Sequence, residues 1–315
     1  AKGQSLTFHD LSGGPLCGDE PIELTQTSVG DMIESIAYAD NRVYLGLKHG
    51  DIVVVDVPFD TVAPPVVGSV AVRSEENKEV EGVAILGSHL YCNLGKDGLR
   101  VVDVADPMNP QPGANVSAAQ EWINGLVVAN GRLYTLERVR DTSPTRMVVR
   151  VYSTVNPAAP SVEGFAEIDR NVGGLHLAVE GTHAYVFGNF WNNGIAIVDV
   201  ATPTNPQLLA TFEDGGNPTP VTSVTAVDNR LYAQRSPFSD ADQARNLMTI
   251  DLTNPAQPQK IDEITLTGFQ SNFTGALPVH ENRIIMTYGV GDVAMEMIDL
   301  ADADKPTSIR TFGEP

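Results

Sequence analysis

The chain is poor in several residue types on which whole classes of protein depend. Only two of its 315 residues are cysteine and only six are lysine, and aromatic residues make up 6% of the total. Two cysteines cannot build a disulfide framework, or a four-ligand zinc site on their own. No stretch approaches the run of about 18 apolar residues that a membrane-spanning helix needs. The sequence therefore predicts neither a disulfide scaffold nor a membrane span.

The shortage of lysine leaves a strongly acidic chain with a net charge of -20. Such a charge repels phosphate backbones and anionic lipid, so nucleic acid is not an expected partner. The acidity suits an extracellular, cell-surface or periplasmic protein. The chain opens on Ala1 rather than methionine, which we interpret as the removal of an export signal or a tag. We expect a secreted or surface location.

The two cysteines, Cys17 and Cys92, leave two interpretations open. They can form a single bridge. Alternatively, Cys92 is a small buried apolar residue, because it follows Tyr91 inside a predicted strand.

What the chain has in quantity is a repeated phrase, spaced by about 48 residues, in which a short apolar run closes on aspartate before a proline-rich turn. A repeat of this length indicates small units that must stack on one another to bury their apolar faces. In one copy Tyr152 stands in place of the aspartate, and a weaker copy ends at Asp10. We interpret the aspartate as structural, because a carboxylate that opens a turn can accept backbone N–H bonds. The clear copies end at Asp56, Asp103, Asp199, Asp251 and Asp299.

Each unit divides into four short extended segments separated by glycine, asparagine and proline turns, and no stretch has a helical period. This pattern predicts an all-β fold, a β-propeller of four-stranded blades. The phrases VVVDV, LRVVDV and IAIVDV, with the turns DPMNP, TPTNP and TNPAQP, resemble the LVIVD-repeat family over about residues 30–315. The resemblance implies a propeller that is secreted or at the cell surface, and it implies no particular activity.

The number of first-and-second strand pairs favours six complete blades. Third-and-fourth pairs number seven if the copy at Asp10 is counted, so seven blades, with residues 1–30 contributing, is the alternative. We expect residues 1–30 to form a strap or partial blade, and residues 31–315 to form the propeller. The expected blades span residues 31–75, 76–118, 119–166, 167–213, 214–265 and 266–315.

Three charged residues stand out when the units are aligned on their second-strand tyrosines. His176 interrupts a row of small inner-strand residues, either as a general base or ligand near the channel, or as a histidine hydrogen-bonded between blades. One position nearer the variable loops, Glu34 and Glu81 supply hard oxygen ligands of the kind that calcium prefers. They are equally well explained as solvated acidic residues.

The same loop face carries a minority of cations and most of the candidate aromatic residues. Cations on one face of an acidic protein favour an anionic group such as a carboxylate, whereas chance clustering explains them without function. Tryptophan among small polar residues suits the face of a sugar ring, although burial under a neighbouring loop is the competing explanation. The candidate ligand-binding residues are Lys48, His49, Trp122, Asn124, Arg138, Trp191 and Arg235.

No local catalytic motif is present, so the leading hypothesis is a module that binds a carbohydrate, a small acidic ligand or a protein partner through the variable loops. A propeller can nevertheless assemble an active site from single residues on several blades. The alternative is therefore a lyase or hydrolase of an anionic glycan at the mouth of the central channel, with His176 as base. A scaffold stiffened by a metal is the third hypothesis. No cofactor is required, and calcium is the one metal that the acidic residues suggest.

Overall fold

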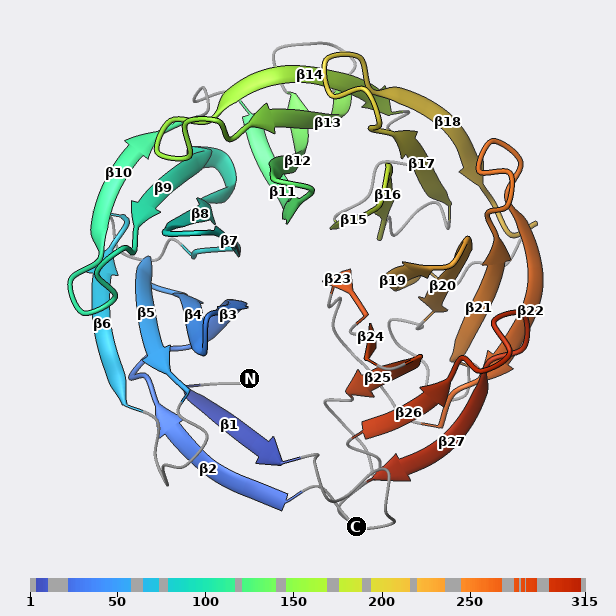
Figure 1. Ribbon diagram of the computed structural model, residues 1–315, viewed down its shortest axis with the longest axis horizontal. Helices are drawn as coiled ribbons and strands as arrows, with labels where there is room; N and C mark the ends of the chain where they lie inside the picture. The colour runs from blue at the N-terminus through green and yellow to red at the C-terminus, as the bar shows by residue number, and fades with distance from the viewer. Residues whose placement is uncertain are drawn as a thin grey trace. The chain divides into compact units, whose positions relative to one another are not determined.

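The computed structural model describes most of the chain, in fourteen stretches. These are residues 4–10, 22–57, 65–73, 79–116, 121–139, 146–168, 176–188, 194–215, 220–235, 245–267, 275–277, 279–280, 282–287 and 295–312. Apart from the single 3-10 turn η1 (Gly95–Asp97), every regular element in these stretches is a β-strand (Figure 1).

Within these stretches the strands form six sheets of four or more strands, each built from consecutive strands, as the repeat predicts. Blade one contains β3 (Ile33–Ala39), β4 (Arg42–Leu47), β5 (Asp51–Asp56) and β6 (Val66–Ala71). Blade two contains β7 (Gly82–Leu86), β8 (His89–Asn93), β9 (Leu99–Asp103) and β10 (Gln111–Asn115). Blade three contains β11 (Glu121–Ala129), β12 (Arg132–Val139), β13 (Arg146–Ser153) and β14 (Ser161–Ile168).

The second half of the chain repeats the arrangement. Blade four contains β15 (His176–Glu180), β16 (His183–Phe187), β17 (Ile195–Asp199) and β18 (Gln207–Phe212). Blade five contains β19 (Val221–Val227), β20 (Arg230–Arg235), β21 (Asn246–Asp251) and β22 (Gln259–Thr265), and β23 (Gly275–Ala276) joins its inner edge in parallel. Blade six contains β24 (Val279–His280), β25 (Arg283–Thr287), β26 (Met295–Asp299) and β27 (Thr307–Phe312).

A further, two-stranded sheet precedes blade one. It pairs β1 (Ser5–Asp10) with β2 (Ile22–Ser28) in antiparallel register. In the described stretches the chain thus has the six four-stranded blades expected from the sequence, and a hairpin within residues 1–30.

The chain divides into two compact units. Unit one comprises Ala1–Thr145 and Arg150–Glu163, and unit two comprises Arg146–Val149 and Gly164–Pro315. The division passes through β13 and β14 of blade three.

In unit one, both faces of a blade are buried against its neighbours. Tyr44 and Val54 of blade one share a cluster with Leu90 and Cys92 of blade two. The opposite face of blade two, through Tyr91, packs on blade three. Strands buried on both faces explain why the phrase is a continuous apolar run instead of an alternating one. Burial of each such side chain contributes about 1.5–3 kcal/mol.

Unit two is packed in the same way. One cluster joins Tyr185 and Phe187 of blade four to Met248 and Ile250 of blade five. A second joins the other face of blade five to blade six, with Tyr232 at its centre. Within each unit, cores of this kind link successive blades, as expected for a repeat whose units cannot fold alone.

The repeated aspartate holds the turn that follows it, which confirms its structural interpretation. The Asp199 carboxylate accepts the backbone N–H of Ala201 at 2.8 Å, and Asp251 accepts that of Thr253 at 2.8 Å. In blade three the residue at this place is Ser153, not Tyr152 as the sequence pattern suggested. Ser153 ends β13, and its hydroxyl accepts the N–H of Val155 at a longer 3.4 Å.

Two second-strand tyrosines each bind the turn of the following blade. The Tyr91 hydroxyl donates to the carbonyl of Pro157, in the turn of blade three, at 3.1 Å. Tyr232 donates in the same way to Ala303, in the turn of blade six, at 2.9 Å. Burial raises the pKa of both tyrosines to about 12, so the donating proton stays in place at neutral pH.

Cys92 is a free and fully buried thiol on β8, and burial raises its pKa. Cys17 lies outside the described residues. Cys92 therefore lies where the sequence predicts it as a small apolar residue, inside the hydrophobic core.

Candidate functional site

The inner strands of three blades carry a β-bulge at the same place. The ladder skips one residue between Ile33 and Ser35 in β3, and the same shift recurs in β11 and β19. The skipped residues are Glu34, Asn124 and Thr222. Bulges re-aim side chains at functional sites and at the rims of closed sheets, so these three positions differ from the rest of the ladder.

Two of the bulges lie in unit one, at the corresponding ends of neighbouring inner strands. There β7 packs between β3 and β11. Polar side chains follow this edge without a break, and we call the group the polar rim. It consists of Glu34, Lys48, Glu79, Glu81, Trp122, Asn124 and Arg138.

The carboxylates of the polar rim are crowded together. Partial burial raises the pKa of Glu34, with a further increase from the Glu79 carboxylate that Lys48 opposes. Partial burial also raises the pKa of Glu81, although its residue surface is exposed. Both carboxylates therefore take up a proton at a higher pH than isolated carboxylates do.

Trp122 is fixed at the centre of the rim. Its indole N–H donates a hydrogen bond to the Glu81 carboxylate, and that bond opposes the upward shift of the Glu81 pKa. Trp122 pairs directly with Arg138 across the β11–β12 ladder. Both side chains are partly exposed.

Arg138 differs from most arginines of this chain. In the described stretches its guanidinium makes no hydrogen bond and no ion pair. On the same strand, Glu137 is fully buried and receives the Arg150 Nε at 2.7 Å and the Tyr152 hydroxyl at 2.9 Å. Neighbouring residues on β12 thus hold a satisfied internal network on one face and an unpaired cation on the other.

His49 and Lys48 continue the rim beyond Glu34. His49 Nδ1 lies 2.8 Å from an Asp31 oxygen, and the same oxygen accepts the His49 backbone N–H at 2.9 Å. Burial acts to raise the pKa of Asp31, but the backbone bonds from His49 and Met32 outweigh it and lower the pKa. His49 is therefore held in place by Asp31, whereas Lys48 faces the Glu34 carboxylate.

No group of three or more His, Cys, Asp or Glu side chains in the described stretches is arranged to hold a metal ion. Of the predicted calcium ligands, Glu34 lies on β3 of blade one and Glu81 lies immediately before β7 of blade two, with Glu79 close to both.

In unit two, His176 begins β15 and pairs with Phe187 in the ladder. The two rings lie 5.7 Å apart, tilted by 30°. Burial lowers the pKa of His176 to about 4, so the imidazole is neutral at pH 7 and a weak base.

Arg235, at the end of β20, is fully buried. Its Nη1 lies 2.6 Å from Asp214, which also contacts the Lys260 ammonium at 3.1 Å. Among the residues that the structure describes, the Arg235 Nε and Nη2 have no hydrogen-bond partner, and neither has the amide of buried Gln234 beside it. Solvent does not reach the Arg235 guanidinium.

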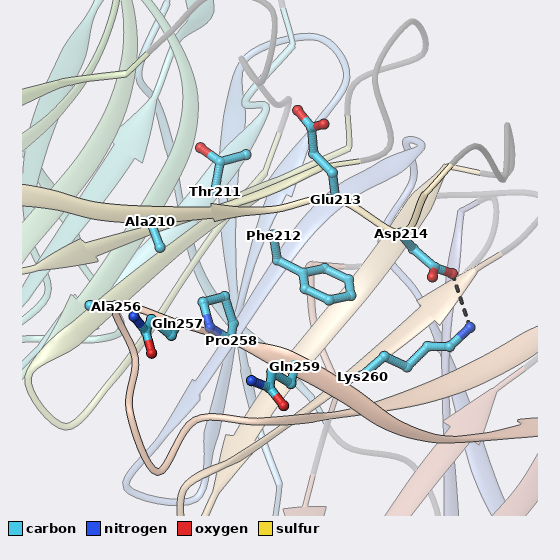
Figure 2. Close-up of a pocket in the computed structure, with 10 residues that line it drawn as sticks. All are labelled: Ala210, Thr211, Phe212, Glu213, Asp214, Ala256, Gln257, Pro258, Gln259 and Lys260. Atoms are coloured by element: carbon cyan, nitrogen blue, oxygen red, sulfur yellow. Dashed lines mark hydrogen bonds and ion pairs between the residues drawn. The ribbon is translucent and has the colours of Figure 1, made fainter.

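A groove of about 600 Å³ opens above this ion pair, between β18 and the turn that leads into β22. Figure 2 shows the Phe212 ring between the two segments that line the groove, with Asp214 and Lys260 joined at one end. Lys260 also contacts Glu263 at 2.7 Å. The one cation that lines the groove is therefore already neutralised.

The sequence predicts Trp122, Asn124, Arg138, Glu34 and Glu81 on one face. The structure places Trp122 beside Glu81 and Arg138, and it places Glu34 and Glu81 near Glu79. Asn124 is the residue skipped in the β11 bulge. Trp191 lies outside the described residues. Asp31, Glu79 and Asp214 were not predicted, although each contacts a predicted residue. Their only sequence signal is position, since each lies within about three residues of an inner or outer strand end.

Comparisons with known proteins address the fold and the repeat. The LVIVD repeat model matches residues 78–116 and 175–214, which contain blades two and four. No curated protein sequence matches the chain. In the described stretches no helix is long and apolar enough to cross a bilayer.

Solved structures resemble the chain in fold at low sequence identity. The periplasmic gluconolactonase of Pseudomonas aeruginosa is 9% identical, with a TM-score of 0.65 over 100% of this chain and 97% of that chain. A chain of the mitotic checkpoint complex is 13% identical, with a TM-score of 0.64 over 91% and 79%. A computationally designed protein, Ika8, is 12% identical, with a TM-score of 0.59 over 90% and 76%. Together with the six sheets and the matched repeats, these likenesses show that the protein is an all-β propeller that carries LVIVD repeats, as its sequence predicts.

Proposed function

We propose that the protein is a binding module that takes an acidic saccharide, such as one containing uronic acid, on the polar rim of unit one. The observation that carries the proposal is the unpaired, partly exposed Arg138 guanidinium beside Trp122. A guanidinium recognises a carboxylate through paired hydrogen bonds, and an indole supplies an apolar face with a polar edge. One acidic sugar ring offers both complementary features.

The other rim residues suit the same ligand. Asn124 and the Glu81 carboxylate supply the donor and acceptor groups that sugar hydroxyls use. Because the Glu81 oxygen holds the indole N–H, the ring is oriented before a ligand arrives. The net charge of -20 opposes an anion at long range, but screening confines that repulsion to within about 8 Å at physiological salt.

The matched repeats and the acidic surface support an extracellular, cell-surface or periplasmic site of action, where such saccharides occur. Catalysis is the second candidate, since a structural neighbour bears the name of a hydrolase. Nothing at the rim favours it. His176, the base that such an enzyme would use, is neutral with a pKa of about 4.

The proposal is tested by calorimetric titration of the protein with oligogalacturonate and with the matching neutral oligosaccharide. We expect binding of the acidic ligand only, and Arg138→Gln should weaken it at least about tenfold through loss of a charged hydrogen bond. Lys305→Gln, which removes one exposed positive charge from unit two, is the matched control and should leave affinity unchanged.

Tryptophan fluorescence of the Trp122→Phe variant gives a second test, because the chain has only two tryptophans. Ligand-induced fluorescence change should vanish in this variant. Equal affinity for acidic and neutral sugars, or an unaffected Arg138→Gln variant, would refute the proposal. Release of an unsaturated or hydrolysed product during the titration would favour the enzymatic alternative.

A further inference from the structure

The two-stranded sheet β1–β2 has the internal geometry of the outer half of a blade. Strands β1, β5 and β21 each have six residues and end in aspartate. Each shifts register against its outer neighbour after its fourth residue, at Phe8, Val54 and Thr249.

The backbone hydrogen bond at the end of the β1–β2 pair also matches the bonds at the same place in the β5–β6 and β21–β22 pairs. The Val29 N–H donates to the Gln4 carbonyl at 2.8 Å, just before β1. In blades one and five the corresponding bonds join Val72 to Gly50 at 2.9 Å and Leu266 to Arg245 at 2.7 Å. β1 and β2 are therefore the third and fourth strands of a blade, and β2 leads directly into blade one (Figure 1).

The first and second positions of this blade hold no strand from the described stretches. Among the strands that the structure describes, β1 pairs with β2 alone, so no described strand takes the backbone donors and acceptors at the other edge of β1. Such an edge is a template for a further strand.

The face of blade one that an inner strand pair would cover is apolar and exposed. Ile36 and Tyr38 on β3 are 52% and 60% exposed. The residues that correspond to Ile36 in blades two and five are buried, with Val83 at 9% and Val224 at 0%, and those that correspond to Tyr38, Ile85 and Ala226, are half-buried.

This exposed face continues an existing interface. Ile36 lies opposite Leu45, and Tyr38 opposite Val43, in the β3–β4 ladder, so each pair shares a face of the sheet. Leu45 and Val43 are buried in a cluster with Leu6 of β1. The hairpin therefore covers the outer part of the face and leaves the inner part open.

We propose that this half blade binds a β-hairpin donated by another polypeptide, which pairs with β1 and covers Ile36 and Tyr38. The required hairpin is of the kind that this chain builds on its own inner strands. Its arms have about five to seven residues with small or branched apolar side chains on the face toward blade one. A two-residue turn of positive φ joins the arms, as at Asp228 and Asn229.

The test uses the full chain and a synthetic peptide with the sequence of residues 221–235, which forms such a hairpin in blade five. The peptide carries two arginines against one aspartate, so its charge complements the acidic protein. We expect saturable 1:1 binding and at least about tenfold slower hydrogen exchange of the β1 amides in the complex. A peptide with proline in the second arm lacks the needed N–H donors and should not bind.

The double variant Ile36→Ser/Tyr38→Ser should weaken peptide binding at least about tenfold while leaving the melting temperature unchanged, because both side chains are already exposed. Val155→Ser, at a site that is 95% exposed on a turn, is the matched control and should bind normally. Absence of binding, or binding without protection of β1, would overturn the proposal. A dimer in which Tyr38 is buried without peptide would assign the face to a second copy instead.

Discussion

At the scale of single residues, His176 shows how burial overrides a role suggested by residue type. A histidine has an ordinary pKa of 6.5, and burial beside Phe187 lowers that of His176 to about 4. Arg235 gives a parallel case, since it lies at a strand end beside a variable loop and is nevertheless fully buried against Asp214. Charge in the sequence does not report access to a ligand.

The His176 shift predicts acid sensitivity. Because the folded-state pKa lies below the unfolded value, the unfolded chain binds more protons between about pH 6.5 and 4, and stability falls as the pH falls through this window. We expect His176→Gln to lose less stability than the wild type over this interval, by up to about 3 kcal/mol. Urea unfolding at several pH values measures the difference.

His183→Gln is the control, since it removes an imidazole from the neighbouring strand β16. It should follow the wild-type pH dependence more closely than His176→Gln does. Identical acid profiles for wild type and His176→Gln would contradict the assigned shift.

At the scale of the element, the third strand and its turn form the best-defined piece of the repeat. In four blades an aspartate carboxylate fixes the turn. A buried tyrosine of the preceding blade donates a hydrogen bond to the turn of blade three and to that of blade six. Blade three has serine in place of the aspartate, and the Ser153 hydroxyl makes only the longer contact with the Val155 N–H.

Restoring the aspartate should therefore stabilise blade three. We expect Ser153→Asp to raise the free energy of unfolding by about 0.5–1 kcal/mol, the contribution of one hydrogen bond to a carboxylate less its desolvation. The reverse change, Asp103→Ser, should lower stability by a similar amount, because Asp103 accepts the Ala105 N–H at 2.9 Å. Chemical denaturation of both variants measures the pair, and a loss of stability in Ser153→Asp would show that the turn of blade three has a different geometry.

The fold was predictable at this scale because its signals are local and repeated. The tight turns occur where the sequence places them, with positive φ at Asn41, Asn130 and Asn229. The bulges at Glu34 and Asn124 could not be predicted, because a ladder shift depends on the partner strand and leaves no mark in a single strand. The Arg235–Asp214 pair was likewise hidden, since it joins two blades through residues that lie 21 positions apart.

At the scale of the whole molecule, the dominant feature is the excess of negative charge. The sequence has 40 acidic against 20 basic residues, and much of the basic minority is used in internal ion pairs such as Arg42–Asp56 and Arg230–Asp251. The remaining carboxylates repel one another and lower the stability of any compact state.

Salt should therefore stabilise the folded protein at neutral pH. We expect the melting temperature to rise by about 2–5 °C between 10 and 150 mM NaCl, since the screening length falls from about 30 to 8 Å. The same titration near pH 4.5, the sequence pI, is the control and should show little or no rise. A melting temperature at pH 7 that does not depend on salt would mean that the charges are already neutralised by pairing or bound ions.

Two glycines of the outer strands suggest how such a chain can change over time without losing its shape. A Cβ atom at Gly68 would lie 2.0 Å from the Pro107 carbonyl oxygen, and one at Gly164 would lie 2.6 Å from that of Pro203. At both places the turn of one repeat rests on the bare backbone of the repeat before it. Because the contact involves main-chain atoms, it does not depend on the side chains of the turn. Exposed turn side chains can therefore be exchanged between repeats, or redesigned, as long as the two glycines are kept.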